Sequence, residues 1–221
     1  MSVNCDTKEK HRTLFPFFID IKDKPGLIIG NGKHALEKVE RMLPYGPRLT
    51  VIAPEFLPEI EAIAEREETI VLERRAFTEA DLEREWTFVI AAGHNREENH
   101  RIAALCKQKK ILVNVVDDQP ACQFVFPSLI AQGSLSIGIC TAGASPSAGI
   151  YLKKQMEELI PDRTEEILDW LQSKRPVIRK AIPDGKQRFA FYHTLSEICM
   201  EENRPLGEEE FLELLYRQIA T

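Results

Sequence analysis

Two groups of residues have the types and spacing that chemistry on a bound nucleotide requires. The first is Gly30-Asn-Gly32-Lys-His-Ala35, a Gly-x-Gly-x-x-Ala pattern that follows a short apolar run and opens an amphipathic stretch. In such a turn the first glycine permits a tight bend, and the second lets the backbone approach a pyrophosphate at a helix N-terminus. We therefore predict that Gly30, Gly32, Lys33 and His34 bind NAD. The alternative is a glycine-rich turn that binds nothing.

The second group is Asn114-Val-Val-Asp117-Asp118-Gln-Pro120, at the end of a later apolar run. Ligands of open α/β sheets bind beyond the carboxyl ends of the strands, so Asp117 and Asp118 are candidate acid–base groups. One of two adjacent carboxylates can face such a site while its neighbour points away. Position alone favours another interpretation, in which an aspartate before Pro120 stabilises a turn.

An acidic residue often ends the second strand of a dinucleotide site, where it bonds the ribose hydroxyls. Here the strand ends at Ala53-Pro54-Glu55, so Glu55 is the nearest acid, displaced by two positions. A carboxylate at the ribose would repel a 2′-phosphate, which favours NAD over NADP. An equally good interpretation makes Glu55 a first-turn acid that compensates the dipole of the next helix.

These motifs need a scaffold, and apolar and amphipathic stretches alternate through the first half of the chain as in an open parallel sheet. The pattern predicts strands at residues 26–30, 48–53, 69–75, 87–92 and 111–115, and helices at residues 33–43, 55–67 and 96–109. Thr78-Glu-Ala-Asp81 has the form of a further helix start. The predicted fold class is α/β, with a Rossmann-like doubly wound parallel sheet.

After Pro120 the pattern changes. Alternating residues on both sides of a Gln132-Gly133 turn predict a β-hairpin, and Ser145 followed by Pro146 predicts a helix start. From there the periodic segments are helical, and we expect breaks at the prolines Pro161, Pro176, Pro183 and Pro205. The chain is thus predicted to contain a sheet domain (residues 1–121), a small β segment (122–145) and a C-terminal helical domain (146–221).

Composition restricts the classes of function. Lys and Arg number 29 against 35 Asp and Glu, a net charge of −6 without a basic tail, so nucleic acid is not an expected partner. No apolar run is long enough to span a bilayer, and the polar start lacks the centre of a signal peptide, so we expect no membrane contact and a cytoplasmic protein. Five cysteines and five histidines without zinc-site spacing predict no metal site.

Taken together, the motifs resemble a known family. The resemblance rests on the glycine loop 30–35, on Leu49-Thr-Val-Ile-Ala-Pro54, on the run from Asn114 through Asp117 and Pro120 to Phe124, and on Ala144-Ser145-Pro146. This combination and order are similar to the siroheme synthase N-terminal family, over about residues 15–161. Members of that family are precorrin-2 dehydrogenases, and many are also sirohydrochlorin ferrochelatases.

The resemblance implies that the chain uses NAD⁺ to oxidise precorrin-2 to sirohydrochlorin, a reaction followed in many members by insertion of Fe²⁺. It implies NAD contacts from Lys33, His34, Pro54 and Glu55. It also assigns the essential aspartate of the family to Asp117, against the turn interpretation. A homodimer formed through the small β segment, and a helical domain that helps to cover the tetrapyrrole, are implied as well.

Two alternatives to the dehydrogenase remain: a chelatase alone, and a tetrapyrrole-binding protein without chemistry. They remain because Asn31, Glu37 and Gly93-His94 depart from the family pattern near the cofactor. A substrate that carries many carboxylates also needs local positive charge. The candidate cations are Lys153, Lys154, Arg175, Arg179, Lys180, Lys186 and Arg188.

Overall fold

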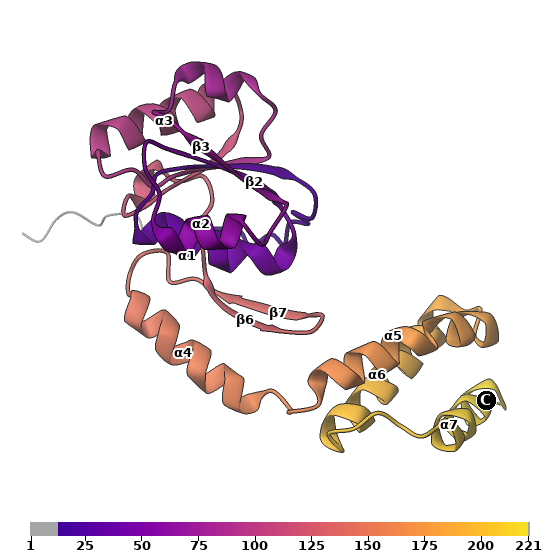
Figure 1. Cartoon of the computed structure of the whole chain (residues 1–221). Helices are drawn as coiled ribbons and strands as arrows, with labels where there is room; N and C mark the ends of the chain where they lie inside the picture. Colours follow the sequence, from indigo (N-terminus) through magenta and orange to yellow (C-terminus); the bar gives the residue numbers. More distant parts are fainter. Residues whose placement is uncertain (1–12, 221) are drawn as a thin grey trace, which may run out of the picture. The chain divides into compact units, whose positions relative to one another are not determined.

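The computed structural model describes residues 13–220, which fall into two compact units (Figure 1). Phe15–Phe126 forms the first, which we call the sheet unit, and residues 127–220 lie in the second, which we call the helical unit. The sheet unit has two clusters of buried apolar side chains, and the helical unit has a third. The three-part domain limits at residues 121 and 145 stay a prediction.

The sheet unit is built on a five-stranded parallel sheet with the strand order β3-β2-β1-β4-β5. Its strands are β1 (Pro25–Ile29), β2 (Arg48–Ala53), β3 (Ile70–Arg74), β4 (Phe88–Ala91) and β5 (Leu112–Val115). The predicted strands are therefore all present, with ends that differ by at most one residue. Strands buried on both faces read as apolar runs, which explains why the sequence located them so closely.

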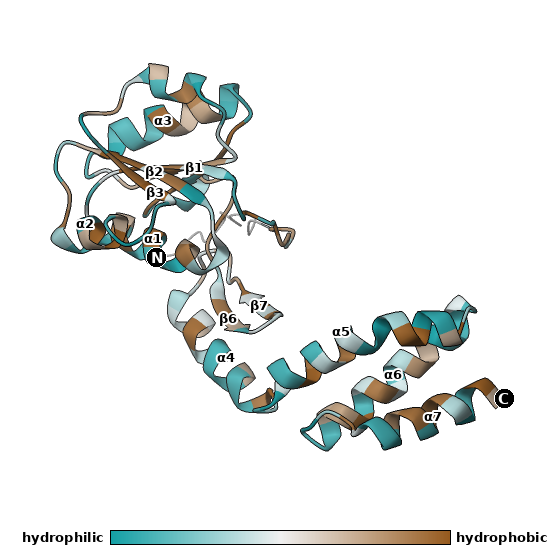
Figure 2. Ribbon diagram, turned by 45° about the vertical axis from the view of Figure 1, so that its right-hand side comes forward, coloured by the Kyte–Doolittle hydropathy of each residue, from teal (hydrophilic) through white to brown (hydrophobic). Residues whose placement is uncertain are grey.

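Helices cover both faces of this sheet. α1 (Lys33–Met42) and α2 (Pro58–Ala64) lie on one face, and α3 (Arg96–Gln108) lies on the other (Figure 1). Neighbouring residues of β1 point to opposite faces, so Ile28 packs in the core beneath α1 and α2 whereas Leu27 packs in the core beneath α3. In Figure 2 the strands β1, β2 and β3 are mostly brown, as expected for a buried sheet. The predicted doubly wound fold is confirmed.

Three short 3₁₀ turns complete the sheet unit: η1 (Leu43–Tyr45), η2 (Glu79–Glu83) and η3 (Gln119–Ala121). The helix start predicted at Thr78 is the capping box of η2, in which Thr78 and Asp81 bond each other's backbone. The helix predicted at residues 55–67 is shorter, because Leu57 is extended (φ −67°, ψ 143°) before Pro58. A residue before proline is disfavoured in the helical region, so α2 begins only at Pro58.

The helical unit begins with the predicted hairpin. β6 (Ser128–Gln132) pairs antiparallel with β7 (Leu135–Ile139), and Gly133 takes φ +54° in the turn between them. Ser145 caps α4 (Pro146–Leu159) by accepting a hydrogen bond from the Ala148 N–H (3.1 Å), which confirms the predicted helix start. The three later helices are α5 (Thr164–Ala181), α6 (Gly185–Glu201) and α7 (Glu208–Ala220).

The predicted helix break at Pro176 is wrong. α5 continues through Pro176, although a proline inside a helix removes one backbone hydrogen bond and crowds the preceding turn. Ile167 and Ile178 lie on either side of Pro176, and both are fully buried in the core that α5 shares with α6 and α7. Burial of one continuous helix face offsets the free-energy cost of the proline. A prediction based on the proline alone takes no account of this packing.

Candidate functional site

The turn from β1 to α1 lies at the carboxyl edge of the sheet, where its first glycine is required by the fold. Gly30 has φ +136°, a conformation that favours glycine, and its N–H donates to the Ile52 carbonyl (3.0 Å). A Cβ atom at Gly30 would collide with the backbone carbonyl of Ala92, directly after β4. Close packing of the two strand ends therefore demands glycine here, whether or not a ligand binds.

The second glycine has a different role. Gly32 is the N-cap of α1 with φ −82°, which any residue can adopt, and no side chain caps the helix. The first turn of α1 contains no acidic residue, so its unpaired N–H groups and the helix dipole favour an anion at this end. Asn31 is not among the residues with positive φ, so it fits the loop without strain in place of glycine.

Asp117 approaches this turn from the end of β5. The Val116 N–H donates to the Ala91 carbonyl (3.0 Å), which ties the start of the loop to β4. Asp117 follows with φ +57° and a side chain that is 82% exposed, and its Oδ2 lies 3.6 Å from Nε2 of His34. The structure thus brings two predicted site residues within ion-pair distance. An exposed carboxylate beside a dinucleotide turn can accept a proton from a bound substrate.

Asp118 has the opposite environment. Its carboxylate is buried, and it accepts hydrogen bonds from His100 Nε2, from Arg96 Nη2 (3.4 Å) and from the Ala121 N–H (3.4 Å). The hydrogen bond from His100 is the largest of the contacts that hold the pKa of Asp118 below its ordinary value. Asp118 is therefore the turn-stabilising aspartate, the role that position alone suggested for either residue.

Pro54 and Glu55 follow β2 directly and are both exposed at the same edge. The interpretation of Glu55 as a first-turn helix acid is wrong, because α2 begins at Pro58 and its first-turn acids are Glu59 and Glu61. The late start of α2 leaves Glu55 in the loop after the strand. Its contact with the ribose stays a prediction.

His94 adds a side chain that the sequence interpretation left unassigned. A Cβ atom placed on Gly32 would come within 3.2 Å of Cε1 of His94, so this exposed imidazole lies against the glycine turn. Buried Asn99 fixes the loop that carries it, since Asn99 Nδ2 donates to the Gly93 carbonyl (2.8 Å) and Asn99 Oδ1 accepts from the Gly93 N–H (3.2 Å). The signal available in the sequence for this contact was a polar residue, Asn99, on the apolar face of a predicted helix.

Among residues 13–220, no three His, Cys, Asp or Glu side chains gather in a way that could hold a metal ion. Within the same residues, no helix is both long and apolar enough to cross a membrane. Cys106, Cys122, Cys140 and Cys199 form no disulfide, and Cys5 lies outside the described residues.

An open helix N-terminus at the carboxyl edge of a doubly wound sheet is the place where Rossmann-like domains bind a dinucleotide, and the sheet unit is a domain of that class. Residues 17–128, just over half of the chain, match the family described as "Putative NAD(P)-binding". The chain belongs to this family.

Comparison with known proteins also confirms the predicted similarity to siroheme synthases. The chain is 32% identical over 196 residues to the siroheme synthase of Thioalkalivibrio sulfidiphilus (strain HL-EbGR7), an alignment that covers 89% of this chain and 40% of that protein. It is 31% identical over 177 residues to the siroheme synthase of Zymomonas mobilis subsp. mobilis, with 80% of this chain and 37% of that protein covered. The chain therefore spans about two fifths of the length of these curated relatives.

A solved structure titled "SirC, precorrin-2 dehydrogenase" has the same fold, with a TM-score of 0.67. The match covers 94% of this chain and 100% of that one at 22% sequence identity.

Proposed function

We propose that the chain is an NAD-dependent dehydrogenase that oxidises precorrin-2 to sirohydrochlorin. The observation that carries this proposal is the approach of Asp117 to His34 at the N-terminus of α1, because it puts a proton acceptor beside the dinucleotide turn. The substrate is suggested by the relatives, which are named siroheme synthase and precorrin-2 dehydrogenase. The cytoplasm stays its predicted location.

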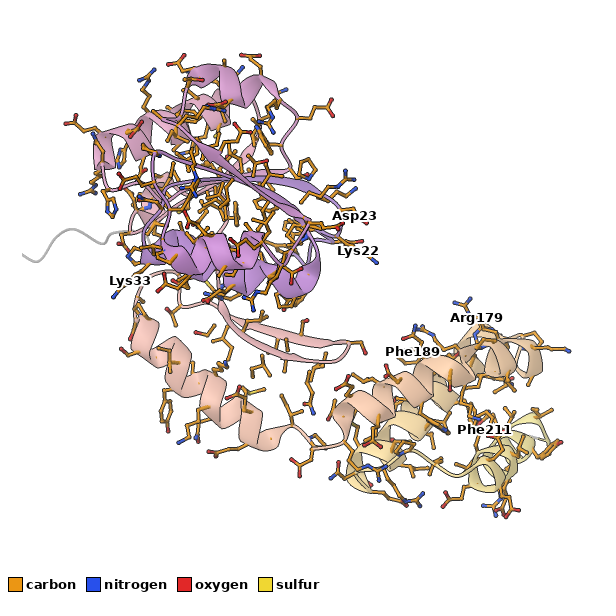
Figure 3. All side chains as sticks on the ribbon, viewed as in Figure 1. Lys22, Asp23, Lys33, Arg179, Phe189 and Phe211 are labelled. Carbon is orange, nitrogen blue, oxygen red and sulfur yellow. The ribbon has the colours of Figure 1, made fainter. Side chains whose placement is uncertain are left out.

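The residues of the β1–α1 turn fit NAD. Gly32 leaves the helix N-terminus open for a pyrophosphate, and exposed Lys33, labelled in Figure 3, adds positive charge at the first turn of α1. Glu55, exposed after β2, is suited to accept hydrogen bonds from the ribose hydroxyls and to repel a 2′-phosphate. This arrangement supports NAD as the cofactor rather than NADP. When bound, NAD⁺ supplies the acceptor for a hydride.

Asp117 is the proposed general base. The reaction removes one hydride and one proton from the substrate, so that precorrin-2 and NAD⁺ give sirohydrochlorin, NADH and a proton. The Asp117 carboxylate takes that proton, and its exposed position allows the proton to pass on to water. The Nε2 atom of His34 lies 3.6 Å from this carboxylate, so the imidazole is the neighbour that Asp117 faces at the turn.

The test is a direct assay of the purified chain with precorrin-2 and NAD⁺ under anaerobic conditions. We expect NADH to appear in step with sirohydrochlorin, and NADP⁺ to support a slower reaction. A protein that binds the tetrapyrrole but forms no NADH at any NAD⁺ concentration would contradict the proposal and would support the tetrapyrrole-binding alternative.

We extend the proposal to a second step in which Fe²⁺ is inserted into sirohydrochlorin. Metal insertion releases two pyrrole protons, and the exposed carboxylate of Asp117 is suited to accept them in turn. The same assay with Fe²⁺ or Co²⁺ added after the oxidation tests this step. If metal is inserted no faster with the protein than without it, the chain is not a chelatase. Metal insertion without NADH formation would favour the chelatase-only alternative.

A homodimer formed through the start of the helical unit is also proposed. The two-stranded sheet of β6 and β7 has no further strand partner among residues 13–220, and such open edges favour pairing with another strand. α4, which contacts both strands of the hairpin, buries only Gly149 and exposes Ile150 (65%), Tyr151 (64%) and Leu159 (75%). A second copy of the chain would cover this apolar surface.

Contacts within the helical unit show which of the candidate cations already have a partner in the protein. Lys153 pairs with Glu157 (3.5 Å), and Arg188 donates to the carbonyls of Ile182 (2.9 Å) and Pro183 (3.0 Å). Within the described residues, the other five candidates are exposed and form no ion pair: Lys154, Arg175, Arg179, Lys180 and Lys186. The last three surround the turn from α5 to α6. Phe189, labelled with Arg179 in Figure 3, is 72% exposed nearby in sequence. We propose these three cations as contacts of the tetrapyrrole carboxylates.

A further inference from the structure

The loop after β5 presents two adjacent aspartates in opposite environments. The Asp117 side chain is 82% exposed and faces His34, whereas the Asp118 side chain is only 5% exposed. Asp117 also has φ +57°, a left-handed conformation that residues other than glycine rarely adopt. Such a conformation persists only where contacts of the surrounding structure hold it.

Those contacts are made by Asp118. Its carboxylate accepts hydrogen bonds from two residues of α3, His100 and Arg96, and from the Ala121 N–H of η3. Its backbone carbonyl accepts a hydrogen bond from the buried thiol of Cys122 (3.2 Å). The side chain and the backbone of Asp118 are thus both fixed, on one side by α3 and on the other by the segment after the loop.

We propose that His100 and Asp118 are positioning residues, which hold the loop after β5 so that Asp117 presents its carboxylate to His34. Because the two aspartates are adjacent, a fixed Asp118 leaves Asp117 little freedom to turn away from the dinucleotide edge. The expected effect of these two residues on kcat rests on the proposed function, whereas their effect on the conformation of the loop does not. The hydrogen bond from His100 also lowers the pKa of Asp118, which keeps this carboxylate ionised as an acceptor.

The neighbouring residue on α3 offers a matched control. Arg101 bonds the carboxylate of Glu79 from η2, so it also joins α3 to another element through an ion pair. Glu79 is remote in sequence from the loop that carries Asp117. If the substitutions act by destabilising α3, the variants His100→Ala and Arg101→Ala should lose activity alike. If they act by displacing Asp117, only His100→Ala should lose activity.

The kinetic test compares these variants in the wild-type and Asp117→Ala backgrounds. His100→Ala is expected to lower kcat by about 10- to 100-fold with the affinity for NAD⁺ unchanged, because small misplacements of a catalytic group cost that much. Arg101→Ala should keep the wild-type kcat. His100→Gln should restore most of it, since the glutamine amide can donate to Asp118 from about the position of Nε2. In the Asp117→Ala background His100→Ala should cost nothing further, because its effect acts through Asp117.

A second measurement does not depend on turnover. The NMR signals of the His34 imidazole ring report on the nearby Asp117 carboxylate, so Asp117→Ala should shift them. We expect His100→Ala and Asp118→Ala to shift the same signals in the same direction, and Arg101→Ala to leave them in place. Wild-type His34 signals in folded His100→Ala and Asp118→Ala would overturn the positioning role even in an active enzyme. The expected shifts in a protein without dehydrogenase activity would keep that role and contradict the proposed function instead.

Discussion

The two units of the molecule gather their candidate functional side chains in different ways. In the sheet unit, His34, His94 and Asp117 are far apart in the sequence, and they meet because the carboxyl ends of parallel strands share one edge. In the helical unit, Arg179, Lys180 and Lys186 come from one short stretch around a helix–helix turn. The first arrangement depends on exact tertiary geometry, and the second depends mainly on local charge. Substitutions should therefore have steep effects in the sheet unit and graded effects in the helical unit.

Asp117→Ala should have the largest effect. Removal of a general base typically lowers kcat by ~10²–10⁴-fold, and we expect that loss with the affinity for NAD⁺ and the dimer unchanged. Asp117→Asn should behave alike, since it keeps the shape of the side chain without the base. The control is Asp23→Ala, because Asp23 is also exposed with positive φ (58°) in the sheet unit but lies outside the site (Figure 3). Steady-state kinetics with NMR or calorimetric NAD⁺ titration would decide, and a wild-type kcat in Asp117→Asn would exclude the base.

The two glycines of the β1–α1 turn separate binding from folding within the sheet unit. Gly32→Val should weaken NAD⁺ binding at least ~10-fold, about 1.4 kcal/mol, because bulk at the N-cap blocks the approach of a pyrophosphate. The fold should survive, since Gly32 has φ −82° and its nearest neighbour is the exposed side chain of His94. Gly30→Ala should instead lower the melting temperature, because its Cβ meets the Ala92 backbone. Calorimetry that gives Gly32→Val the wild-type affinity would refute the site.

The apolar surface of α4 tests the role of the helical unit in assembly. Ile150→Asp should weaken the dimer by about 10-fold or more, as expected when an apolar contact is replaced by a charge at an interface. Val71→Asp is the matched control, since Val71 is similarly exposed (53%, against 65% for Ile150) on β3 of the sheet unit. Light scattering over a range of concentrations measures the effect. A monomeric mass for the wild-type chain at all micromolar concentrations would exclude the dimer.

The cations of the helical unit should give a smaller, graded effect. The double variant Arg179→Gln/Lys180→Gln is expected to raise KM for the tetrapyrrole by about 3- to 10-fold with little change in kcat, because each exposed charge contributes modestly in water. The control is Lys22→Gln/Lys24→Gln, which removes the same charge from exposed positions of the sheet unit. The difference between the two variants should shrink with added salt. Equal KM values for both would remove these cations from the proposed binding surface.

Acid should affect the two units slightly differently. Arg75 holds the pKa of Asp81 in the sheet unit at about 2, with help from the Thr78 N–H, and Arg204 does the same for Glu210 in the helical unit, with the Gly207 N–H. A lowered pKa means that each carboxylate stabilises the fold above its unfolded pKa of about 4, and that this contribution is lost as the pH falls to about 2.

Asp81 should account for the larger part of that loss, because its side chain is 8% exposed and that of Glu210 is 47% exposed. Between about pH 4 and pH 2, the melting temperature measured by calorimetry should therefore depend less on pH in both variants than in the wild type, and the reduction should be larger in Asp81→Asn than in Glu210→Gln. An equal change in both variants would mean that burial does not distinguish the two ion pairs.

Elements with local signals could be located from the amino-acid sequence alone. Apolar runs located the five strands, Gly30 and Gly32 located the turn from β1 to α1, and Ser145-Pro146 located the start of α4. These predictions succeeded because strand burial, glycine conformation and helix capping depend on neighbouring residues.

Long-range packing distinguishes alternatives that the local sequence pattern does not distinguish. Asp117 and Asp118 are the same residue type in adjacent positions, and only the packing of α3, which brings His100 to Asp118, leaves Asp117 free to face His34. Pro176 lies within a helix because Ile167 and Ile178 are buried on both sides of it. In each case the deciding interaction joins residues that are distant in the chain or depends on a shared core, and its free energy is therefore absent from any short stretch of sequence.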